Sequence, residues 1–455
     1  MRYRVVDPHT GRELRSYPTL SSAELRARVE RSERAFRDWE RTSFAERAAV
    51  LREVARRLRA DADEHARLMA EEMGKPVRQG RGEAEKCAWA CEYYAEHAER
   101  FLADEPAETE ATKSYVAYRP LGPVLAIMPW NFPYWQVFRF AAPALMAGNT
   151  VLLKHAPNVP GCAERIERLL ADAGLPEGVF QSVFVTNQQA GAVIRNRRVR
   201  AVTLTGSVNA GRSVARQAGA QVKKTVLELG GSDPYLILED ADVEHAAAKC
   251  VESRLVNSGQ SCIAAKRFIV VEAVRERFTE ALVEGMRAAR VGDPRDEATT
   301  VGPQAREDLR DKLHEQVRGS VAKGARLLLG GEPAPRDGWY YPPSVLANVR
   351  KGTPAYAEEV FGPVASILPV RDRRTAVRVA NDSAFGLGAA VFTADVAEGE
   401  RIAREELRAG CCFVNDYVRS DPRLPFGGVM DSGYGRELGV HGIREFVNVK
   451  TVYVA

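Results

Sequence analysis

Short apolar runs that alternate with helix-like stretches constrain the fold of this chain more than any other feature. Between residues 124 and 207 these runs are Val124–Pro129, Thr150–His155, Val179–Val185 and Ala201–Ser207. Helix-like segments such as GCAERIERLLADAG lie between them. Apolar runs of this length, separated by helices, are typical of parallel strands that are buried on both faces. The pattern predicts βαβ units in a Rossmann-like, nucleotide-binding α/β domain.

A second alternating set begins near Gly230-Gly231 and predicts a second α/β domain. Its apolar runs are Pro234–Glu239, Arg267–Glu272, Ala365–Val370, Ala389–Ala394 and Gly410–Asn415. The chain has 455 residues, which is more than one simple core accommodates, so about two or three domains are expected.

The first hundred residues have helical character. Ser21 and Glu24 form a capping-box pattern at the start of the first helix. A break is expected near Arg41–Phe44, followed by one helix from about Ala45 to Met73, which a Gly-Lys-Pro stop signal ends. Helix-like sequence continues over Gly82–Leu102. The segment Thr112–Pro120 and the tail after residue 445 are β-like.

Composition and charge exclude several classes of protein. The net charge of +4 is small for this length, and arginine alternates with glutamate over Arg26–Ala60, which suits solvated helix faces better than a nucleic-acid surface. The chain contains no apolar stretch of about 18 residues, so no membrane span is expected. The first residues, MRYRVVDPHTGREL, contain no apolar leader region. An odd number of cysteines, seven, does not form a disulfide scaffold. We expect a cytoplasmic protein with free thiols.

Two cysteines, Cys87 and Cys91, stand four residues apart in a predicted helix and therefore share one face. Two thiols at this spacing can contribute to a metal site. No other Cys or His pair with ligand spacing accompanies them, so core packing is the favoured interpretation and no metal is expected.

Cys262 lies in the segment NSGQSCIAAKR, among small and polar residues. Four interpretations are open for such a cysteine: a buried filler, half of a disulfide, a metal ligand or a nucleophile. Its neighbours Ser258, Gly259 and Ser261 are small and leave the thiol open to attack on a substrate. No second cysteine follows within two positions.

Three further segments carry polar groups at positions that suit catalysis or ligand binding. Glu228 precedes a double glycine in LELGGSDP, where it is either a satisfied carboxylate or a general base whose pKa an apolar pocket raises. Asn131 follows the first parallel strand, where it either donates to an oxyanion or caps a helix. TLTGSVNAG places glycines between a strand and a helix, as phosphate sites do, although such a turn can also bind nothing.

Taken together, these segments resemble the aldehyde dehydrogenase superfamily. GPVLAIMPWNFP, GNTVLLKHAPNVP, TGSVNAG, LELGGSDP, NSGQSC, EEVFGPV and PFGGVMDSGYGRELG occur in the order of that family and span nearly the whole chain. The resemblance implies the aldehyde dehydrogenase fold. Its dinucleotide-binding domain would comprise residues 1–104 and 121–229, its catalytic domain residues 230–424, and a small β oligomerisation element residues 105–120 and 440–455.

The resemblance also implies catalytic roles. Cys262 would be the nucleophile, Glu228 the general base and Asn131 part of the oxyanion hole. A thiolate that attacks an aldehyde gives a thiohemiacetal, hydride loss gives a thioester, and water activated by Glu228 would hydrolyse it.

Cofactor residues carry over from the family where they match. They are Trp130, Lys154, Gly206, Ser207, Gly211, Glu359 and Phe361. NAD-preferring relatives often have a glutamate three residues after the lysine, whereas this chain has Pro157. A 2′-phosphate would meet no carboxylate there, so NADP is favoured and NAD stays open. Met430 replaces a lysine common in its motif, and no consequence of this change is apparent.

Arg139 suggests the substrate. It lies eight residues after Asn131 and about two helical turns along, where a cation suits a distal carboxylate. Succinate-semialdehyde dehydrogenases resemble this chain at Arg139 and at Ser420. Trp135 lies on much the same face of the predicted helix as Arg139. The expected reaction is oxidation of succinic semialdehyde to succinate. The alternatives are another small aldehyde, CoA as acyl acceptor, or a thiol-dependent hydrolase, which would need a histidine base. By resemblance, a homodimer or homotetramer is expected.

Overall fold

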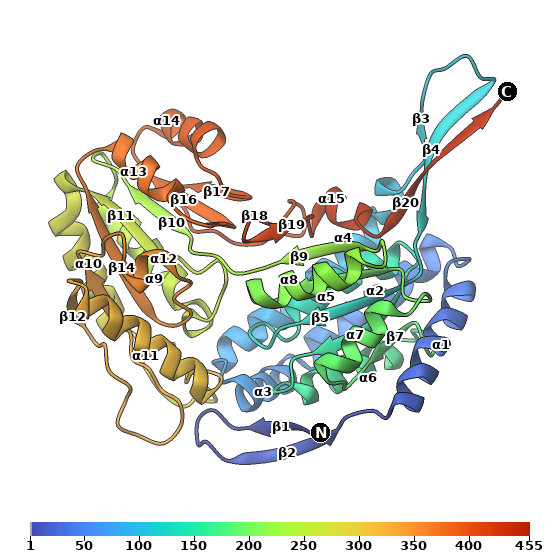
Figure 1. Cartoon of the computed structure of the whole chain (residues 1–455), viewed down its shortest axis with the longest axis horizontal. Helices are drawn as coiled ribbons and strands as arrows, with labels where there is room; N and C mark the ends of the chain where they lie inside the picture. Colours follow the sequence, from blue (N-terminus) through green and yellow to red (C-terminus); the bar gives the residue numbers. More distant parts are fainter. Residues whose placement is uncertain (1) are drawn as a thin grey trace.

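The computed structural model describes residues 2–455, which form two α/β lobes and a projecting β arm (Figure 1). The first lobe is built on a six-stranded sheet in the order β19-β9-β8-β5-β6-β7. Its parallel strands are β5 (Pro123–Met128), β6 (Thr150–His155), β7 (Phe180–Ser182), β8 (Ala201–Thr205) and β9 (Lys224–Glu228), and the short β19 (Gly433–Tyr434) pairs antiparallel with β9. The predicted parallel sheet of βαβ units is therefore confirmed. Strand β9 was not predicted.

Helices surround this sheet. Those that connect its strands are α5 (Trp135–Met146), α6 (Pro160–Asp172), α7 (Asn187–Arg195) and α8 (Val208–Gly219). The N-terminal part adds a hairpin of β1 (Arg2–Val6) and β2 (Glu13–Pro18), followed by α1 (Ser22–Trp39), α2 (Phe44–Ala60), α3 (Ala62–Met73) and α4 (Val77–Phe101). Cys87 and Cys91 are fully buried on α4 within the main apolar core, which confirms that they serve in core packing.

The N-terminal helices follow the sequence signals with one exception. The capping box is confirmed, since the Ser21 hydroxyl accepts from the Glu24 N–H and the Glu24 carboxylate accepts from the Ser21 N–H. The break between α1 and α2 is also confirmed. The single helix expected from Ala45 to Met73 is wrong, because it divides at Asp61 into α2 and α3. Asp61 leaves helical geometry, and its carboxylate accepts a hydrogen bond from Arg165 at 2.9 Å.

The second lobe contains a seven-stranded sheet in the order β12-β13-β14-β11-β10-β16-β17. Its strands are β10 (Pro234–Ile237), β11 (Arg267–Val271), β12 (Arg326–Leu329), β13 (Ser344–Ala347), β14 (Val364–Val370), β16 (Gly388–Phe392) and β17 (Cys411–Val414). All pairs are parallel except β12 with β13. The helices of this lobe are α9 (Val243–Leu255), α10 (Arg275–Arg287), α11 (Glu307–Ala322), α12 (Pro354–Ala357), α13 (Arg373–Asn381) and α14 (Val396–Arg401).

The arm is a three-stranded antiparallel sheet that extends away from both lobes (Figure 1, cyan and red). It consists of β3 (Glu105–Pro106), β4 (Lys113–Pro120) and β20 (Val447–Val454), with Val447 opposite Pro120 and Val454 opposite Lys113. Both β-like segments expected from the sequence are therefore strands, and they pair with each other. Within residues 2–455, no helix combines the length and the apolar character needed to cross a membrane.

Candidate active site

The turn that carries Cys262 has an unusual backbone. Asn257, Ser258 and Gly259 follow α9 and have φ values of 53°, 57° and 76°, so three consecutive residues lie in the left-handed region. Side chains do not favour this conformation, and it persists only where the surroundings hold it. The Asn257 N–H donates to Gln79 Oε1 at 2.6 Å, and the Ser258 hydroxyl accepts from the Gly302 N–H at 2.8 Å. The turn is thus fixed from outside.

Gly259 also allows a close approach of two backbones. A Cβ atom at this position would lie 2.2 Å from the carbonyl carbon of Gly362 and 2.6 Å from the nitrogen of Pro363. Only glycine fits such a contact. A side chain at residue 259 would force Gly362 and Pro363, which follow Glu359, away from the segment that leads to Cys262. The requirement for glycine here therefore sets how closely Cys262 and Glu359 approach.

Cys262 is partly exposed and opens into a cavity of about 520 Å³ between the two lobes. The other predicted site residues that line this cavity are Trp130, Asn131, Gly206, Ser207, Glu359 and Phe361. Burial raises the pKa of the Cys262 thiol to about 12, Arg139 and Lys266 oppose this rise, and the carboxylates of Glu359 and Glu228 reinforce it. In this state the thiol is neutral at pH 7, so a nearby base or a more positive environment is needed to generate the thiolate.

Asn131 links the first lobe to the nucleophile turn. It follows β5, is 5% exposed, and its Nδ2 donates to the Gln260 carbonyl at 3.1 Å. In return, Asn257 Nδ2 donates to the Asn131 carbonyl at 2.6 Å. The amide of Asn131 therefore lies beside the segment that carries Cys262, with one N–H left to donate to a ligand.

Glu228 lies at the end of β9 and is 2% exposed. Burial raises its pKa well above the ordinary value, and Glu437 reinforces this rise, while Arg139 and Arg436 oppose it. Glu228 Oε1 has no hydrogen-bond partner among the described residues. A buried carboxylate with a raised pKa and a free oxygen has the properties of a general base.

Arg139, on α5, is placed differently from the expectation that it faces the substrate directly. Its guanidinium is 2% exposed, forms a buried ion pair with Glu437, and lies over the ring of Phe426 at 4.8 Å. Its Nη2 donates to Thr205 Oγ1 at 3.4 Å, and Thr205, unlike Arg139, lines the cavity. The charge of Arg139 is therefore already balanced by a carboxylate, and it acts on Glu228 and Cys262 from behind the cavity wall.

Trp135 and Ser420, both expected at the substrate site, contact each other, although neither lines the cavity that Cys262 opens into. Trp135 Nε1 donates to Ser420 Oγ at 3.1 Å. Lys86 of α4 joins them, since its Nζ donates to Ser420 Oγ at 2.8 Å and lies 4.5 Å from the centre of the Trp135 ring. Burial, followed by the positive charge of Arg139, lowers the pKa of Lys86 to about 8. Lys86 has no carboxylate within ion-pair distance among residues 2–455.

The remaining cofactor candidates lie near the carboxyl ends of the first-lobe strands, except Phe361, which precedes β14 of the second lobe. Lys154 is the next-to-last residue of β6, is 7% exposed, and its ammonium has no hydrogen-bond acceptor among the described residues. Ser207 begins α8 and accepts from the Ala210 N–H at 3.3 Å. Gly211, one turn into α8, packs on Leu229, whose methyl groups would lie 2.6 Å from a Cβ atom. Trp130 and Phe361 meet edge to face at 5.8 Å.

The sequence pattern of the aldehyde dehydrogenase family matches residues 1–452. The chain belongs to this family. It is 48% identical to Escherichia coli succinate semialdehyde dehydrogenase [NAD(P)+] Sad over 98% of this chain and 97% of the relative. It is 47% identical to Mycobacterium tuberculosis succinate-semialdehyde dehydrogenase [NADP(+)] 1 over all of both chains. The Streptococcus pyogenes succinic semialdehyde dehydrogenase, solved in complex with NADP+, is 38% identical and superposes with a TM-score of 0.97 over 99% of each chain.

The structure of this aldehyde dehydrogenase adds two residues that sequence reasoning missed. Glu83 of α4 accepts at Oε1 from the N–H groups of Tyr134 and Trp135, both at 2.8 Å, and so caps the start of α5. Lys75 pairs with Glu83 and lies 3.9 Å from the centre of the Phe132 ring. This buried ion pair therefore supports the segment that carries Asn131. Nothing local in the sequence distinguishes Glu83 from the other glutamates of its helix.

Proposed function

We propose that this aldehyde dehydrogenase oxidises succinic semialdehyde to succinate, with NADP+ favoured over NAD+ as hydride acceptor. The observation that carries the proposal is the meeting of Cys262 and Asn131 from two lobes at one cavity, with the buried carboxylate of Glu228 close enough to act on the Cys262 thiol. The names of the E. coli and M. tuberculosis relatives support the choice of substrate.

The first half of the reaction uses Cys262 and two hydrogen-bond donors. The thiolate attacks the aldehyde carbon, the C–S bond forms, and the carbonyl electrons move to oxygen. The free N–H of the Asn131 amide and the backbone N–H of Cys262, which donates to no other described residue, stabilise that oxyanion. Bound NADP+ or NAD+ supplies the acceptor for the hydride that leaves the thiohemiacetal carbon.

The second half uses Glu228. Its free, buried oxygen takes a proton from water as the water attacks the thioester carbon. The C–S bond then breaks, succinate leaves, and the sulfur of Cys262 is regenerated. A carboxylate with an ordinary pKa is a weaker base than Glu228, whose pKa burial raises.

The residues around the cavity fit a dinucleotide. The N-terminus of α8 at Ser207 lines the cavity, and free N–H groups at a helix start attract phosphate. Lys154 carries a charge without a hydrogen-bond acceptor among the described residues. The residue three positions later is Pro157, which has no carboxylate. Lys154 therefore suits a 2′-phosphate, which would supply the missing acceptor.

Steady-state kinetics test the proposal directly. Absorbance at 340 nm is followed with succinic semialdehyde and either NADP+ or NAD+. We expect kcat/KM to be higher with NADP+, and succinate to form in equal amount to the reduced cofactor. Thiol-dependent hydrolysis without cofactor reduction, or a requirement for CoA, would reject the proposal.

We assign the distal carboxylate of the substrate to the group formed by Lys86, Trp135 and Ser420, with Arg139 contributing positive potential from behind. Lys86 is the cation of this group whose charge no carboxylate balances, whereas Arg139 is paired with Glu437. The Lys86 ammonium contacts a hydroxyl and an aromatic face, while the carboxylates of Asp421 and Glu83 act on it only from a distance, so it gains from an anionic ligand in direct contact.

Replacement of Lys86 by methionine is expected to raise KM for succinic semialdehyde about tenfold or more, corresponding to the loss of one charged hydrogen bond. KM for butanal, which has no carboxylate, should change little. In the unaltered enzyme, KM for succinic semialdehyde should rise as the pH passes about 8, because Lys86 then loses its proton. Equal changes of KM for both aldehydes would remove Lys86 from this role.

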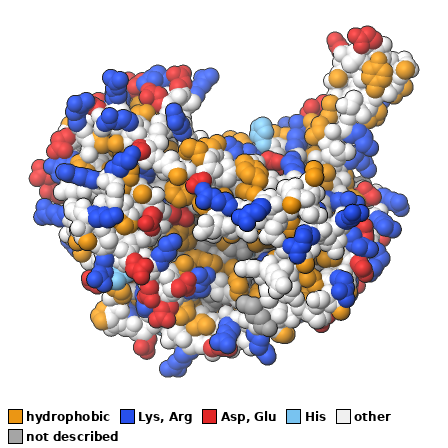
Figure 2. Space-filling view, in the orientation of Figure 1, with side chains coloured by type: hydrophobic (Ala, Val, Ile, Leu, Met, Phe, Trp, Pro, Cys, Tyr) orange, Lys and Arg blue, Asp and Glu red, His pale blue; other side chains and the backbone are white. Residues whose placement is uncertain are grey.

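The arm supports a proposal of self-association as a homodimer or homotetramer. Val449, Tyr453 and Val454 of β20 are exposed, and Figure 2 shows hydrophobic side chains gathered on the arm. An isolated three-stranded sheet with exposed edges and apolar side chains is stabilised by a partner surface. We expect Tyr453→Glu to lower the molecular mass in sedimentation experiments, and an unchanged mass would argue against the arm as the interface.

We further propose a cytoplasmic location, consistent with seven free cysteines.

A further inference from the structure

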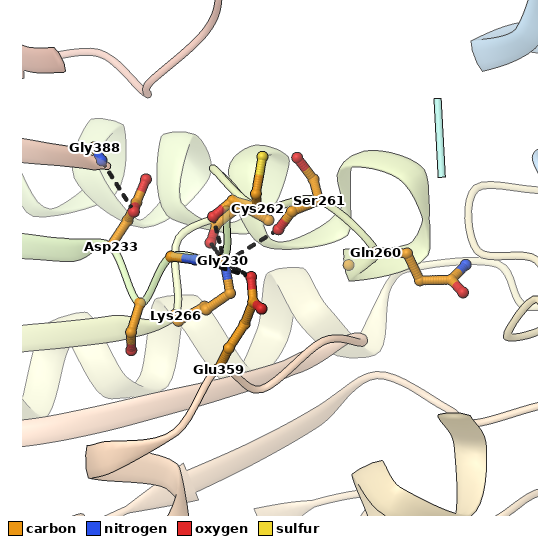
Figure 3. Close-up of polar contacts among 12 residues, drawn as sticks. Gly230, Asp233, Gln260, Ser261, Cys262, Lys266, Glu359 and Gly388 are labelled. Atoms are coloured by element: carbon orange, nitrogen blue, oxygen red, sulfur yellow. Dashed lines mark hydrogen bonds and ion pairs between the residues drawn. The ribbon is translucent and has the colours of Figure 1, made fainter. Parts of the chain in front are cut away.

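Lys266 lies beside the backbone segment Ser261–Ala264, the nucleophile turn that carries Cys262. Its side chain is 1% exposed. Its Nζ donates to the carbonyls of Ser261 at 3.1 Å, Cys262 at 2.7 Å and Ala264 at 3.1 Å (Figure 3). All three N–H groups of the ammonium are thereby used on the backbone of the segment that carries the nucleophile.

The same ammonium reaches the cofactor side of the cavity. Lys266 Nζ lies 4.0 Å from Glu359 Oε1, and Glu359 in turn accepts from the Gly231 N–H at 3.0 Å. Figure 3 shows the sulfur of Cys262 directed away from Lys266, toward the opposite side of the turn. Lys266 therefore acts on the thiol through the backbone and through its charge, and not by direct contact.

We propose that Lys266 is a positioning residue that clamps the Ser261–Ala264 backbone in the geometry that presents the Cys262 thiol, and that ties this turn to Glu359. The proposal rests on the proposed role of Cys262 as nucleophile. A buried ammonium is costly to place, so the use of all three of its N–H groups at one turn indicates a requirement of that turn.

The charges around the two groups agree with this role. Cys262 faces the cations Arg139 and Lys266 and the carboxylates Glu359 and Glu228. Lys266 faces Glu359, Asp233 and Arg254, and burial lowers its pKa while the two carboxylates oppose that change. Removal of Lys266 leaves the thiol with one cation and two carboxylates, which disfavours the thiolate.

Arg267 provides a matched control in the next position of the chain. It is also 1% exposed, and it also donates to three carbonyls, those of Ser232, Val379 and Ala380, at 2.9 to 3.0 Å. None of these carbonyls belongs to the nucleophile turn. Lys266→Met and Arg267→Met therefore remove equivalent buried cations that differ in the segment they support.

The test measures alkylation of Cys262 by iodoacetamide as a function of pH, without aldehyde or cofactor, with mass spectrometry to identify the modified residue. We expect Lys266→Met to lower the alkylation rate at pH 8 about tenfold, equivalent to a rise of one unit in the pKa of the thiol. The affinity for NADPH, followed by its fluorescence, should fall several-fold. Both variants should lose thermal stability, but Arg267→Met should keep the pH profile of the unaltered enzyme.

Two further variants complete the test. Lys266→Arg retains the charge and should restore most of the alkylation rate, whereas Lys266→Gln replaces Lys266→Met if the latter does not fold. An alkylation profile of Lys266→Met that matches that of Arg267→Met would overturn the proposal for Lys266 alone. If alkylation of Cys262 left the activity of the unaltered enzyme intact, the proposed function itself would fail.

Discussion

Replacement of Cys262 by alanine is expected to lower aldehyde-dependent reduction of NADP+ by a factor on the order of 10⁴ or more, as removal of a covalent nucleophile does in other enzymes. Without the sulfur, the aldehyde carbon cannot form the tetrahedral adduct from which hydride leaves. The measurement is absorbance at 340 nm with succinic semialdehyde at saturating cofactor. NADPH binding to the variant, followed by fluorescence, should stay close to that of the unaltered enzyme.

Cys412 serves as the matched control for this change. It is a free, partly exposed cysteine on β17, outside the cavity that Cys262 lines. Cys412→Ala should retain most of the activity, because its thiol contacts neither substrate nor cofactor in the proposed reaction. Comparable losses in both variants would point to a general effect on folding, and undiminished turnover in Cys262→Ala would refute the covalent mechanism.

Replacement of Glu228 by glutamine is expected to stop the reaction after one turnover. The thiohemiacetal still forms and hydride still leaves, but the thioester then lacks the base that activates water. Rapid mixing should show a burst of about one NADPH per active site, followed by a steady rate lowered about 10²- to 10⁴-fold. Hydroxylamine, which attacks thioesters without a base, should restore part of the turnover.

The pH dependence gives a second readout for Glu228. Burial raises its pKa, so the carboxyl group is protonated at low pH and becomes a competent base only as the pH rises through that raised value. Turnover of the unaltered enzyme should therefore increase with pH, and Glu228→Gln should lack this rising limb. If Glu228→Gln showed no burst and its turnover still increased with pH, the base would be a group other than Glu228.

The sequence predicted those parts of the molecule that depend on local patterns. Apolar runs identified four strands of the first sheet and five of the second to within a few residues, and Thr150–His155 matches β6 at both ends, whereas β12 and β13 of the second sheet were not predicted. Ser21 and Glu24 located the start of α1, because a capping box is formed by residues three apart. Strand β9 was not predicted because Lys224 and Thr225 begin it and Glu228 ends it, so its apolar part is only two residues long.

Local sequence patterns could not predict contacts between segments that are distant in the sequence. Arg139 pairs with Glu437, almost 300 residues further along the chain, and this pairing alters what the arginine offers a substrate. Lys86 meets Ser420 across a separation of 334 residues. Glu83 caps α5 from another helix, where no local signal in α5 itself marks the partner. In each case, the side chain that completes a buried charge is known only once the fold brings the segments together.

The two lobes divide the reacting groups between them, since Asn131 and Glu228 belong to the first and Cys262 to the second. A 3.1 Å hydrogen bond from Asn131 to Gln260 and its 2.6 Å counterpart from Asn257 join the two sets directly, and Gln79 of the first lobe adds a 2.6 Å bond to the Asn257 N–H. A small hinge rotation between the lobes would separate nucleophile from oxyanion donor without disturbing either lobe internally. Substitutions at these contacts between the lobes therefore provide a way to change turnover through the rigidity of the interface, while the reacting side chains themselves stay unchanged.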